Sequence, residues 1–370
     1  MKILVLNYEY PPIGGGASPV SKDLCEQLAK RGNQVTVVTM RYKDLPKHEN
    51  VNGVEIYRVN CLRTKKSVCS PLEQMTYIIS AFLFLERYLK EEHFDINYTH
   101  FIIPTGVVSV LLKKKFALEY VITAHGSDVL GHNNKRFRFL YTILKKPWCY
   151  IVREARVVVA PSQYLLDLMK KSETNARFEL IKNGIDTSVF VPDIKKKQIL
   201  VMCRLQETKR VEDIINAISL LDLTGWHIQI LGDGPQKQKL QTLVTEKKLE
   251  QYVDFRGWIE NKSKEHLKIL GETYIYISAS ELENCPISVL EAKCSGCRLV
   301  LSDIKAHRQL IDDENCFYKC GDILALSKKL QDEMRQYEGI SQFNFEHEDY
   351  NEYDWKNVVD KYMLLMGIKK

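Results

Sequence analysis

The sequence lacks any long apolar segment. Among its 370 residues the two longest uncharged apolar runs, 74–85 and 101–112, stop at 12 residues each, so no membrane-spanning helix is expected. Glycine and proline are sparse, at 18 and 11 residues, which excludes collagen-like and low-complexity chains. The first apolar stretch meets Asn7, Tyr8 and Glu9 at once, too early for a signal peptide. We therefore expect a cytoplasmic chain of roughly two to three domains.

Acidic residues are under-represented in the first half of the chain. Residues 1–190 carry 27 Lys and Arg against 18 Asp and Glu, whereas residues 191–370 carry 26 against 29. This asymmetry indicates two domains with different partners. The basic clusters at 113–115 and 145–146 are typical of a solvated face or of a surface that meets an anionic membrane or acceptor. No nucleic-acid-binding motif accompanies the charge, so nucleic acid is not an expected partner.

Cysteine is plentiful, and in a chain without a signal peptide its ten residues predict reduced thiols. The spacing of Cys294, Cys297, Cys316 and Cys320 approaches that of a zinc ribbon. Cys294, however, lies in a helical pattern that ends at 295–296. Isolated buried thiols are the alternative, and the sequence does not decide between the two.

Strands and helices alternate along the chain. Most strand candidates are β-branched runs without polar alternation, which suit a parallel sheet covered on both faces. They are 2–6, 35–40, 120–124, 156–160, 198–203, 227–231, 274–278 and 298–302. The rhythm restarts after a polar stretch at 192–197, which predicts two doubly wound, Rossmann-like α/β domains. The tail at 354–366 is predicted to be an amphipathic helix that packs against another element.

Several strands are followed directly by residues suited to ligand binding. They are Gly14 to Gly16, His125 to Asp128, Arg204, Gly232 to Pro235 and Glu283. In open α/β sheets, ligands bind beyond the carboxyl ends of the strands. The first glycines allow a ligand to approach the backbone ahead of a helix, although an ordinary tight turn fits equally well. A dinucleotide site is disfavoured because the G-x-G-x-x-G spacing fails and the second strand ends without an acid.

Two cations and two carboxylates stand out in the second half. Arg204 and Lys209 bracket a strand-to-helix turn, where they can clamp a diphosphate; two solvated cations are the alternative. Pro286 fits the first turn of a helix, whose backbone donors and dipole form an anion site. Glu283 precedes that helix and Glu291 lies in its second turn, so both can accept hydrogen bonds from sugar hydroxyls. A helix with ordinary acidic residues near its start is the alternative.

Together these motifs resemble the signature of the family 4 glycosyltransferases of the GT-B fold. The resemblance centres on the Glu283-x7-Glu291 stretch and extends over nearly the whole chain. Its pieces are Gly14-Gly15-Gly16-Ala17, Ala124-His125-Gly126-Ser127-Asp128, Asn183-Gly184-Ile185-Asp186, Arg204 with Lys209, Leu231-Gly232-Asp233-Gly234-Pro235, Phe255-Arg256-Gly257, Leu290-Glu291-Ala292 and Ser302-Asp303.

The resemblance implies two Rossmann-like domains facing across a cleft. Residues 1–192 would form an acceptor domain, to which a helix at about 353–370 crosses back, and residues 193–352 would bind a nucleotide sugar. The implied catalytic residues are His125, Glu283, Arg204 and Lys209. The implied donor-binding residues are Gly15, Gly16, Arg204, Lys209, Trp258, Glu283, Ile287, Ser288 and Glu291.

Each of these residues has an implied role. Glu291 would bind the ribose, and Arg204 and Lys209 the diphosphate, assisted by backbone donors of the glycine loop and of the helix after Pro286. Glu283 would hold a hydroxyl of the transferred sugar. His125 would lie near the reacting centre, and the region of Trp258 near the base.

The implied reaction is retaining transfer of a hexosyl or N-acetylhexosaminyl group from a UDP- or GDP-sugar to a glycan or lipid-linked acceptor. It requires no metal or other cofactor. The setting it suggests is surface polysaccharide or lipopolysaccharide biosynthesis, with the basic first half in peripheral contact with the inner face of an anionic membrane. A nucleotide-sugar epimerase or hydrolase of the same fold, and a non-catalytic scaffold, are the alternatives. The donor sugar, base, acceptor, linkage and oligomeric state stay open.

Overall fold

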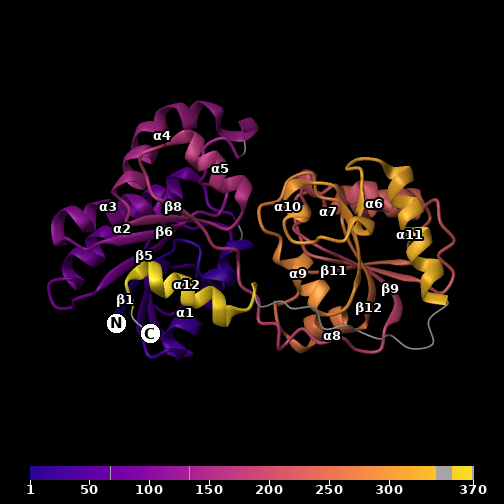
Figure 1. Cartoon of the computed structure of the whole chain (residues 1–370), viewed down its shortest axis with the longest axis horizontal. Coiled ribbons are helices and arrows are strands. Elements are labelled where there is room, and N and C mark those ends of the chain that lie inside the picture. The colour runs from indigo at the N-terminus through magenta and orange to yellow at the C-terminus, as the bar shows by residue number, and fades with distance from the viewer. Residues whose placement is uncertain (67, 133, 339–351, 369–370) are drawn as a thin grey trace. The chain divides into compact units, whose positions relative to one another are not determined.

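The chain folds into two compact α/β units, each built on its own sheet (Figure 1). The computed structural model describes residues 1–66, 68–132, 134–338 and 352–368, apart from the side chains of 134–142 and 338. The first unit comprises Met1–Gly184 together with Asn351–Lys370, and the second comprises Ile185–Tyr350.

The division between the units falls earlier than the predicted boundary at 192/193. The residues just before that boundary attach to the second unit. The Asp193 amide donates to the Gly271 carbonyl at 3.1 Å, and the Phe190 ring lies 6.2 Å from that of His266, centroid to centroid. A Cβ on Gly271 would lie only 3.3 Å from the Val191 carbonyl oxygen. The polar stretch that suggested the boundary is therefore packed against the second unit rather than linking the two.

An eight-stranded sheet forms the centre of the first unit, in the order β3-β4-β2-β1-β5-β6-β7-β8. All neighbouring strands are parallel except β3 and β4. The strands are Lys2–Leu6 (β1), Gln34–Met40 (β2), His48–Val51 (β3), Val54–Val59 (β4), Ile96–His100 (β5), Tyr120–Thr123 (β6), Val157–Ala160 (β7) and Phe178–Leu180 (β8). Strands β5, β6 and β7 are buried at every residue, as the inner strands of a covered parallel sheet must be.

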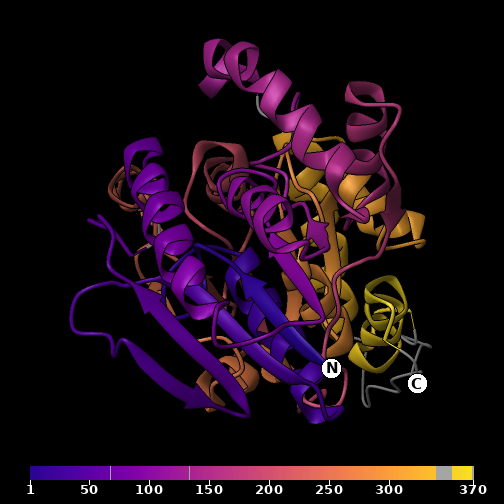
Figure 2. The same cartoon turned by 90° about the vertical axis from the view of Figure 1, so that its left-hand side faces the viewer.

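Six helices accompany this sheet in the described part of the chain (Figures 1 and 2). They are Ala17–Lys30 (α1), Pro71–Tyr88 (α2), Thr105–Phe116 (α3), Asn134–Glu154 (α4), Gln163–Ser172 (α5) and Trp355–Met366 (α12). Helix α12 packs on α1, where Arg31 pairs with Asp360. Trp355 at its start fills the space beside Gly184, whose Cβ would meet the indole ring at 2.5 Å. The C-terminal helix is thus part of the first unit.

The second unit contains a six-stranded, wholly parallel sheet in the order β11-β10-β9-β12-β13-β14. Its strands are Lys196–Met202 (β9), His227–Leu231 (β10), Val253–Gly257 (β11), Thr273–Ser278 (β12), Arg298–Ser302 (β13) and Phe317–Tyr318 (β14). Its helices are Val211–Ile218 (α6), Lys237–Glu246 (α7), Lys264–Glu272 (α8), Ile287–Cys294 (α9), Lys305–Arg308 (α10) and Ile323–Glu338 (α11), with short 3-10 turns at Glu207–Lys209 and Glu314–Cys316. An apolar core that includes Ile214, Ile228 and Leu326 lies between the sheet and its helices.

Each sheet has one point where the strand order reverses. In the second unit this point lies between β9 and β12, and in the first unit between β1 and β5. The doubly wound, Rossmann-like expectation is confirmed for both units. Such folds bind ligands beyond the carboxyl ends of the strands at the reversal. In the described residues, no helix combines the length and apolar character that crossing a membrane requires.

Candidate active site

Arg204 follows β9 at the reversal point of the second unit, on a loop fixed by two glycines. Gly232 has φ +128°, and a Cβ there would lie 1.9 Å from the Cys203 carbonyl oxygen. Gly234 is similarly crowded, because a Cβ there would lie 2.3 Å from the Leu205 carbonyl oxygen. Only glycine allows the loop after β10 to pack so tightly on the loop after β9. The half-buried Arg204 is therefore carried by a rigid loop.

Lys209 and Glu283 form an ion pair that joins the two loops at the reversal point. Both side chains are largely buried, with 17% and 16% of their surfaces exposed. The Ser280 hydroxyl donates to the same Glu283 oxygen at 2.8 Å, and the Glu281 amide donates to the Thr208 carbonyl at 2.9 Å. A cation and a carboxylate predicted to contact different parts of a ligand thus contact each other.

Helix α9 starts directly beyond these loops. Pro286 is its N-cap residue, with φ −73° and ψ 99°, and Ile287 is its first helical residue. The first-turn amides, including those of Ile287 and Ser288, have no intrahelical acceptors, and the helix dipole adds positive potential there. The hydroxyl of the buried Tyr276 donates to the Ser288 hydroxyl oxygen at 2.9 Å, which fixes the Ser288 side chain. The helix ends at Cys294, with Gly296 at φ +75° beyond it.

Glu291 is buried on α9 and lies beside two residues that were not predicted to contribute to the site. The Asn261 side-chain amide donates to one carboxylate oxygen at 2.9 Å, and Nε2 of His266 lies 3.9 Å from the other. Because Nδ1 of His266 accepts from the Lys262 amide at 3.2 Å, the neutral ring carries its proton on Nε2, which lies 3.1 Å from the Met202 sulfur. Burial lowers the pKa of His266 to about 4, so this ring is neutral at pH 7.

His307 is a second buried histidine that sequence reasoning missed. Its Nδ1 lies 2.8 Å from the Ser302 carbonyl oxygen and its Nε2 lies 3.2 Å from the Ser278 hydroxyl. Burial lowers its pKa, so the neutral ring supports the strand ends beneath Glu283. The only sequence signal for His307 was its position just after the strand at 298–302. The segment around it looks like an ordinary short helix.

Trp258 and Cys203 complete the surroundings. Trp258 follows β11 directly and is 66% exposed. The Gly257 carbonyl before it accepts from the Gly232 amide at 2.7 Å, which ties the Trp258 segment to the loop beside Arg204. Burial raises the pKa of the Cys203 thiol to about 12. This thiol is therefore protonated at pH 7 and does not act as a nucleophile.

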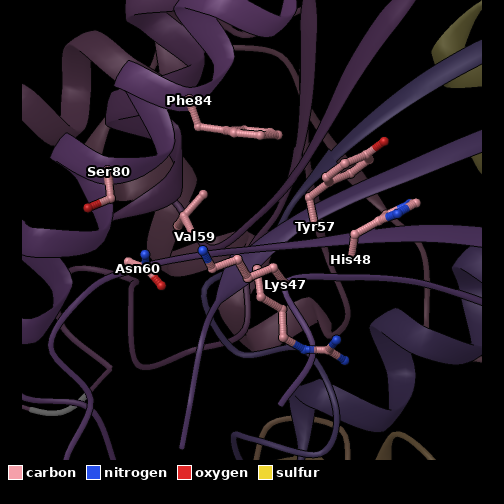
Figure 3. A pocket seen from close by; sticks show the side chains of 8 residues that line it. Lys47, His48, Tyr57, Val59, Asn60, Ser80 and Phe84 are labelled. Atoms are coloured by element: carbon pink, nitrogen blue, oxygen red, sulfur yellow. The ribbon is translucent and has the colours of Figure 1, made fainter. Parts of the chain in front are cut away.

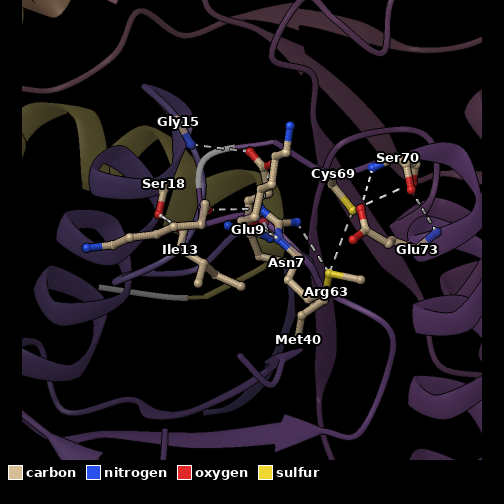
Figure 4. Close-up of polar contacts among 12 residues, drawn as sticks. Asn7, Glu9, Ile13, Gly15, Ser18, Met40, Arg63, Cys69, Ser70 and Glu73 are labelled. Atoms are coloured by element: carbon tan, nitrogen blue, oxygen red, sulfur yellow. Dashed lines mark hydrogen bonds and ion pairs between the residues drawn. The ribbon is translucent and has the colours of Figure 1, made fainter. Parts of the chain in front are cut away.

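The glycine loop of the first unit contains an internal carboxylate (Figure 4). The Gly15 amide donates to Glu9 at 3.4 Å, and Glu9 also contacts Arg63, whose side chain is fully buried, at 3.4 Å. Gly14 has φ +105°, and its amide donates to the Lys66 carbonyl at 2.9 Å. A Cβ at Gly16 would meet no atom within 4 Å, so there is open space above this N-cap residue of α1. Glu9 was not predicted to lie at this loop.

His125 follows β6 and forms a buried pair with His100 at the end of β5. Nε2 of His125 lies 2.9 Å from Nδ1 of His100, and the two rings stack with centroids 5.2 Å apart. Asp128 fixes the loop, since its carboxylate accepts from the His125 amide at 2.9 Å and from the Ile102 amide at 2.7 Å. Burial lowers the pKa of both histidines, that of His125 to about 3. At pH 7 both rings are neutral and share one N–H···N hydrogen bond.

The second unit therefore brings Arg204, Lys209, Glu283 and the start of α9 to the strand ends at one reversal point. Glu291 lies one turn into the same helix. Gly15, Gly16 and His125 belong to the first unit, at the strand ends around its own reversal point. The cysteines of the zinc-like spacing do not assemble, because the described residues contain no group of three or more metal-ligating side chains.

Comparison with known proteins identifies the class. The Glycosyltransferase Family 4 model matches residues 14–189, and the Glycosyl transferases group 1 model matches residues 186–344. The two models adjoin at the junction of the two units and together span most of the chain. The chain is an enzyme of this glycosyltransferase family, with the α/β architecture of the GT-B fold.

Individual relatives are distant but match over most of their length. N-acetyl-alpha-D-glucosaminyl L-malate synthase of Bacillus anthracis is 24% identical, over 84% of this chain and 81% of its own. Alpha-monoglucosyldiacylglycerol synthase of Acholeplasma laidlawii is 21% identical, over 81% and 80%. The crystal structure of Anabaena HepE in complex with UDP-glucose superposes with a TM-score of 0.72 at 15% identity, covering 99% of both chains.

Proposed function

We propose that this enzyme is a retaining glycosyltransferase that moves a hexosyl or N-acetylhexosaminyl group from a UDP- or GDP-sugar to a glycan or lipid-linked acceptor. The observation that carries the proposal is the cluster of Arg204, Lys209, Glu283 and Glu291 at the reversal point of the second unit. The family supports it, and so does the UDP-glucose bound by a protein of the same fold. The names of two relatives describe sugar conjugates, one of malate and one of diacylglycerol.

In the proposed donor complex, the diphosphate lies at the start of α9. The Ile287 and Ser288 amides donate to its oxygens, and Arg204 and Lys209 supply positive charge. Glu291 accepts hydrogen bonds from the ribose hydroxyls, oriented for this by Asn261. The backbone after β11, at Trp258, contacts the base.

The proposed chemistry needs charge stabilisation rather than a nucleophile from the protein. As the sugar–phosphate bond breaks, negative charge grows on the diphosphate and positive charge on the sugar ring. Arg204, Lys209 and the α9 dipole stabilise the first, while Glu283 holds the sugar. The departing phosphate oxygen takes the proton of the acceptor hydroxyl on the same face. The anomeric configuration is thereby retained, and no metal is required.

The ion pair between Lys209 and Glu283 has a specific place in this scheme. A bound donor would draw Lys209 toward its phosphate and Glu283 toward a sugar hydroxyl. Because the scissile bond joins the phosphate to the sugar, both residues would then lie beside that bond. The pair keeps the two charges satisfied until the donor arrives. Replacing either residue then removes a contact made in the transition state and leaves the other with unbalanced charge.

The proposal is tested by assaying nucleotide release from a panel of UDP- and GDP-sugars, with and without membrane lipid extract as acceptor. Arg204→Ala is the test variant, and Arg256→Ala is the control, because Arg256 is an exposed, ion-paired arginine on β11. We expect Arg204→Ala to lower kcat/KM by about 30- to 1000-fold, the effect of removing one preorganised charge. The control should stay within about threefold.

Each outcome of this assay has a meaning. Release that depends on acceptor, with retained configuration in the product, supports the proposal. Release or epimerisation of donor without acceptor favours the hydrolase or epimerase instead. Full activity in Arg204→Ala contradicts the assigned site, and the absence of release with every donor favours a non-catalytic scaffold.

We further propose that the enzyme works on the cytoplasmic side of a membrane, in surface polysaccharide or lipopolysaccharide assembly. The support is the excess of Lys and Arg in residues 1–190 and the diacylglycerol in the name of one relative. A basic surface near anionic headgroups gains affinity that salt screens. Binding to anionic vesicles should therefore weaken as salt is raised. Binding unaffected by salt, or none, contradicts this setting.

A further inference from the structure

Helix α2 of the first unit is apolar on its outer side as well as its inner side. Leu72, Met75, Ile79 and Leu83 are 63%, 59%, 58% and 51% exposed. Their spacing of three and four residues places them on one stripe of the helix. Residues 74–85 contain no charge at all. A helix that is apolar all round is normally buried, so this exposed stripe needs a partner.

The outward direction of this stripe is fixed by strong inward contacts. The opposite side of α2 buries Tyr77, Ala81 and Leu85, and the Tyr77 hydroxyl donates to the Val38 carbonyl at 2.9 Å. At the helix start, Ser70 and Glu73 form a capping box. The helix cannot rotate to hide its outer stripe without losing these contacts, so the stripe is a stable property of the folded unit.

The apolar surface continues into the segment before the helix. Leu62 and Val68 are 54% and 41% exposed, and the Leu62 amide donates to the Thr76 hydroxyl on α2 at 3.0 Å. We define the α2 surface as Leu62, Val68, Leu72, Met75, Ile79 and Leu83. Its aliphatic composition and lack of hydrogen-bonding groups fit a partner without specific polar contacts.

Positive charge surrounds the α2 surface. Lys65 and Lys66 are exposed in the preceding segment, which has no acidic residue between 60 and 72. Arg87 and Lys90 are exposed at the far end of the helix, where Glu86 is paired with Lys115 and Glu91 is an exposed acid. An apolar stripe bordered by lysine and arginine is the pattern of helices that lie in a membrane interface.

A cavity beside α2 adds one more cation to this border. Its volume is about 360 Å³, and Figure 3 shows Ser80 and Phe84 of α2 facing Tyr57, Asn60 and Lys47 across it. Lys47 is exposed at this cavity. A lysine, an amide and a hydroxyl around a shallow hollow can hold a lipid phosphate beside the inserted stripe.

We propose that the α2 surface is the face by which the enzyme docks on an anionic lipid bilayer, with Leu72, Met75, Ile79 and Leu83 in the headgroup–acyl boundary. This deepens the membrane setting of the proposed function and rests on it. Apolar insertion and electrostatic attraction together supply the two signals that stable peripheral attachment needs. A second copy of the chain would gain little from the surrounding lysines, because these repel one another across a symmetric contact.

The test is co-sedimentation with vesicles of phosphatidylcholine alone or of an equal mixture of phosphatidylcholine and phosphatidylglycerol. The test variant is Ile79→Glu with Leu83→Glu. The control is Leu220→Glu with Leu324→Glu, two leucines that are equally or more exposed on the second unit. We expect the test variant to bind the mixed vesicles at least about tenfold more weakly, because charged residues oppose insertion. The control should bind like the wild type.

Vesicle binding, sedimentation velocity and nucleotide titration together separate membrane docking from the alternatives. Wild-type binding to the mixed vesicles that is stronger than to phosphatidylcholine, and lost in the test variant only, supports the proposal. Equal loss in both variants, or none in the test variant, overturns it. Sedimentation velocity that shows a dimer in the wild type and a monomer in the test variant, with vesicle binding unchanged, overturns it in favour of a second copy. Nucleotide titration of the test variant without lipid should match the wild type. A loss of vesicle binding in this variant can then be distinguished from a failure of the proposed donor site.

Discussion

The ion pair between Lys209 and Glu283 gives a sharp energetic prediction. Each side chain is about five-sixths buried, so their coupling should lie between that of exposed pairs and that of fully buried pairs. Exposed pairs contribute about 0–1 kcal/mol, and breaking a buried pair costs about 3–5 kcal/mol. Glu283 keeps its hydrogen bond from Ser280 when Lys209 is lost, which lowers the cost. We therefore expect a coupling free energy of about 1–2 kcal/mol.

The assay is a double-mutant cycle with Lys209→Met, Glu283→Gln and the double variant. Urea unfolding is monitored by hydrogen exchange in peptides of β9 and β12. These peptides report on the second unit alone, which is needed because the two units need not unfold in one transition. The matched control is the pair of Lys196 and Glu272. Its atoms lie 2.8 Å apart and its glutamate is as buried as Glu283, but its lysine is 58% exposed. We expect a control coupling below about 1 kcal/mol.

The same variants carry the functional side of the prediction. Glu272 lies at the amino end of β12, on the edge of the sheet opposite the candidate site. Glu272→Gln should therefore leave nucleotide release unchanged, whereas Lys209→Met should lower kcat by about 30- to 1000-fold. A coupling near zero at Lys209 and Glu283, or equal activity in both variants, would refute the reasoning.

Two further predictions concern stability. Gly232→Ala should lower the free energy of unfolding by more than about 3 kcal/mol, since its Cβ would lie 1.9 Å from a carbonyl oxygen at positive φ; Gly225→Ala, with φ +79° and no contact under 3.8 Å, should cost about 1 kcal/mol. Urea titration of both variants checks this, and equal costs would contradict the packing argument. The urea midpoint should also fall as pH drops below 6.5, because the lowered pKa values of His100 and His125 mean that the unfolded chain binds protons the folded rings do not. The pKa of Asp128, raised to about 6 by burial, opposes this only below pH 6, so a midpoint that rises between pH 7 and 6 contradicts the buried neutral pair.

Much of the fold could be predicted from local sequence. The segments 2–6 and 298–302 are strands with the predicted bounds, because aliphatic runs have few other solutions in a parallel sheet. The tail helix at 354–366 was also predicted, and the structure places Asp354 at its N-cap. Its packing on the first unit depends on Trp355 beside Gly184 and on Asp360 paired with Arg31, and both partners lie far away in the sequence.

Strand β5 shows what local sequence does not reveal. Its residues Ile96–His100 include asparagine, threonine and histidine, yet every one is buried. The Asn97 side-chain amide donates to the Ser109 hydroxyl at 2.9 Å, and Thr99 lies 2.6 Å from the same oxygen. Only α3, folded back onto the strand, supplies this hydroxyl. A polar strand of this kind therefore becomes visible only with tertiary structure.

The candidate site also contains some residues that local sequence could predict and others that it could not. Arg204, Lys209, Glu283 and Glu291 could be predicted because their residue types follow strands or begin a helix. Their supporting partners could not, since Asn261 and His266 reach Glu291 from a different loop and helix. Similarly, nothing in the sequence around Glu9 indicated that its carboxylate would lie at the Gly15 amide.

The most direct test of the account is calorimetric titration of UDP, GDP and ADP into the wild type and Glu291→Gln. Glu333→Gln is the control, since this largely buried carboxylate faces Arg298 beside α11, away from the candidate site. The account predicts that UDP or GDP binds the wild type and the control alike, and that Glu291→Gln loses about tenfold or more in affinity, the effect of one charged hydrogen-bond acceptor. Nucleotide binding that is unchanged in Glu291→Gln, or absent from the wild type, would contradict the assignment of the donor site to the second unit.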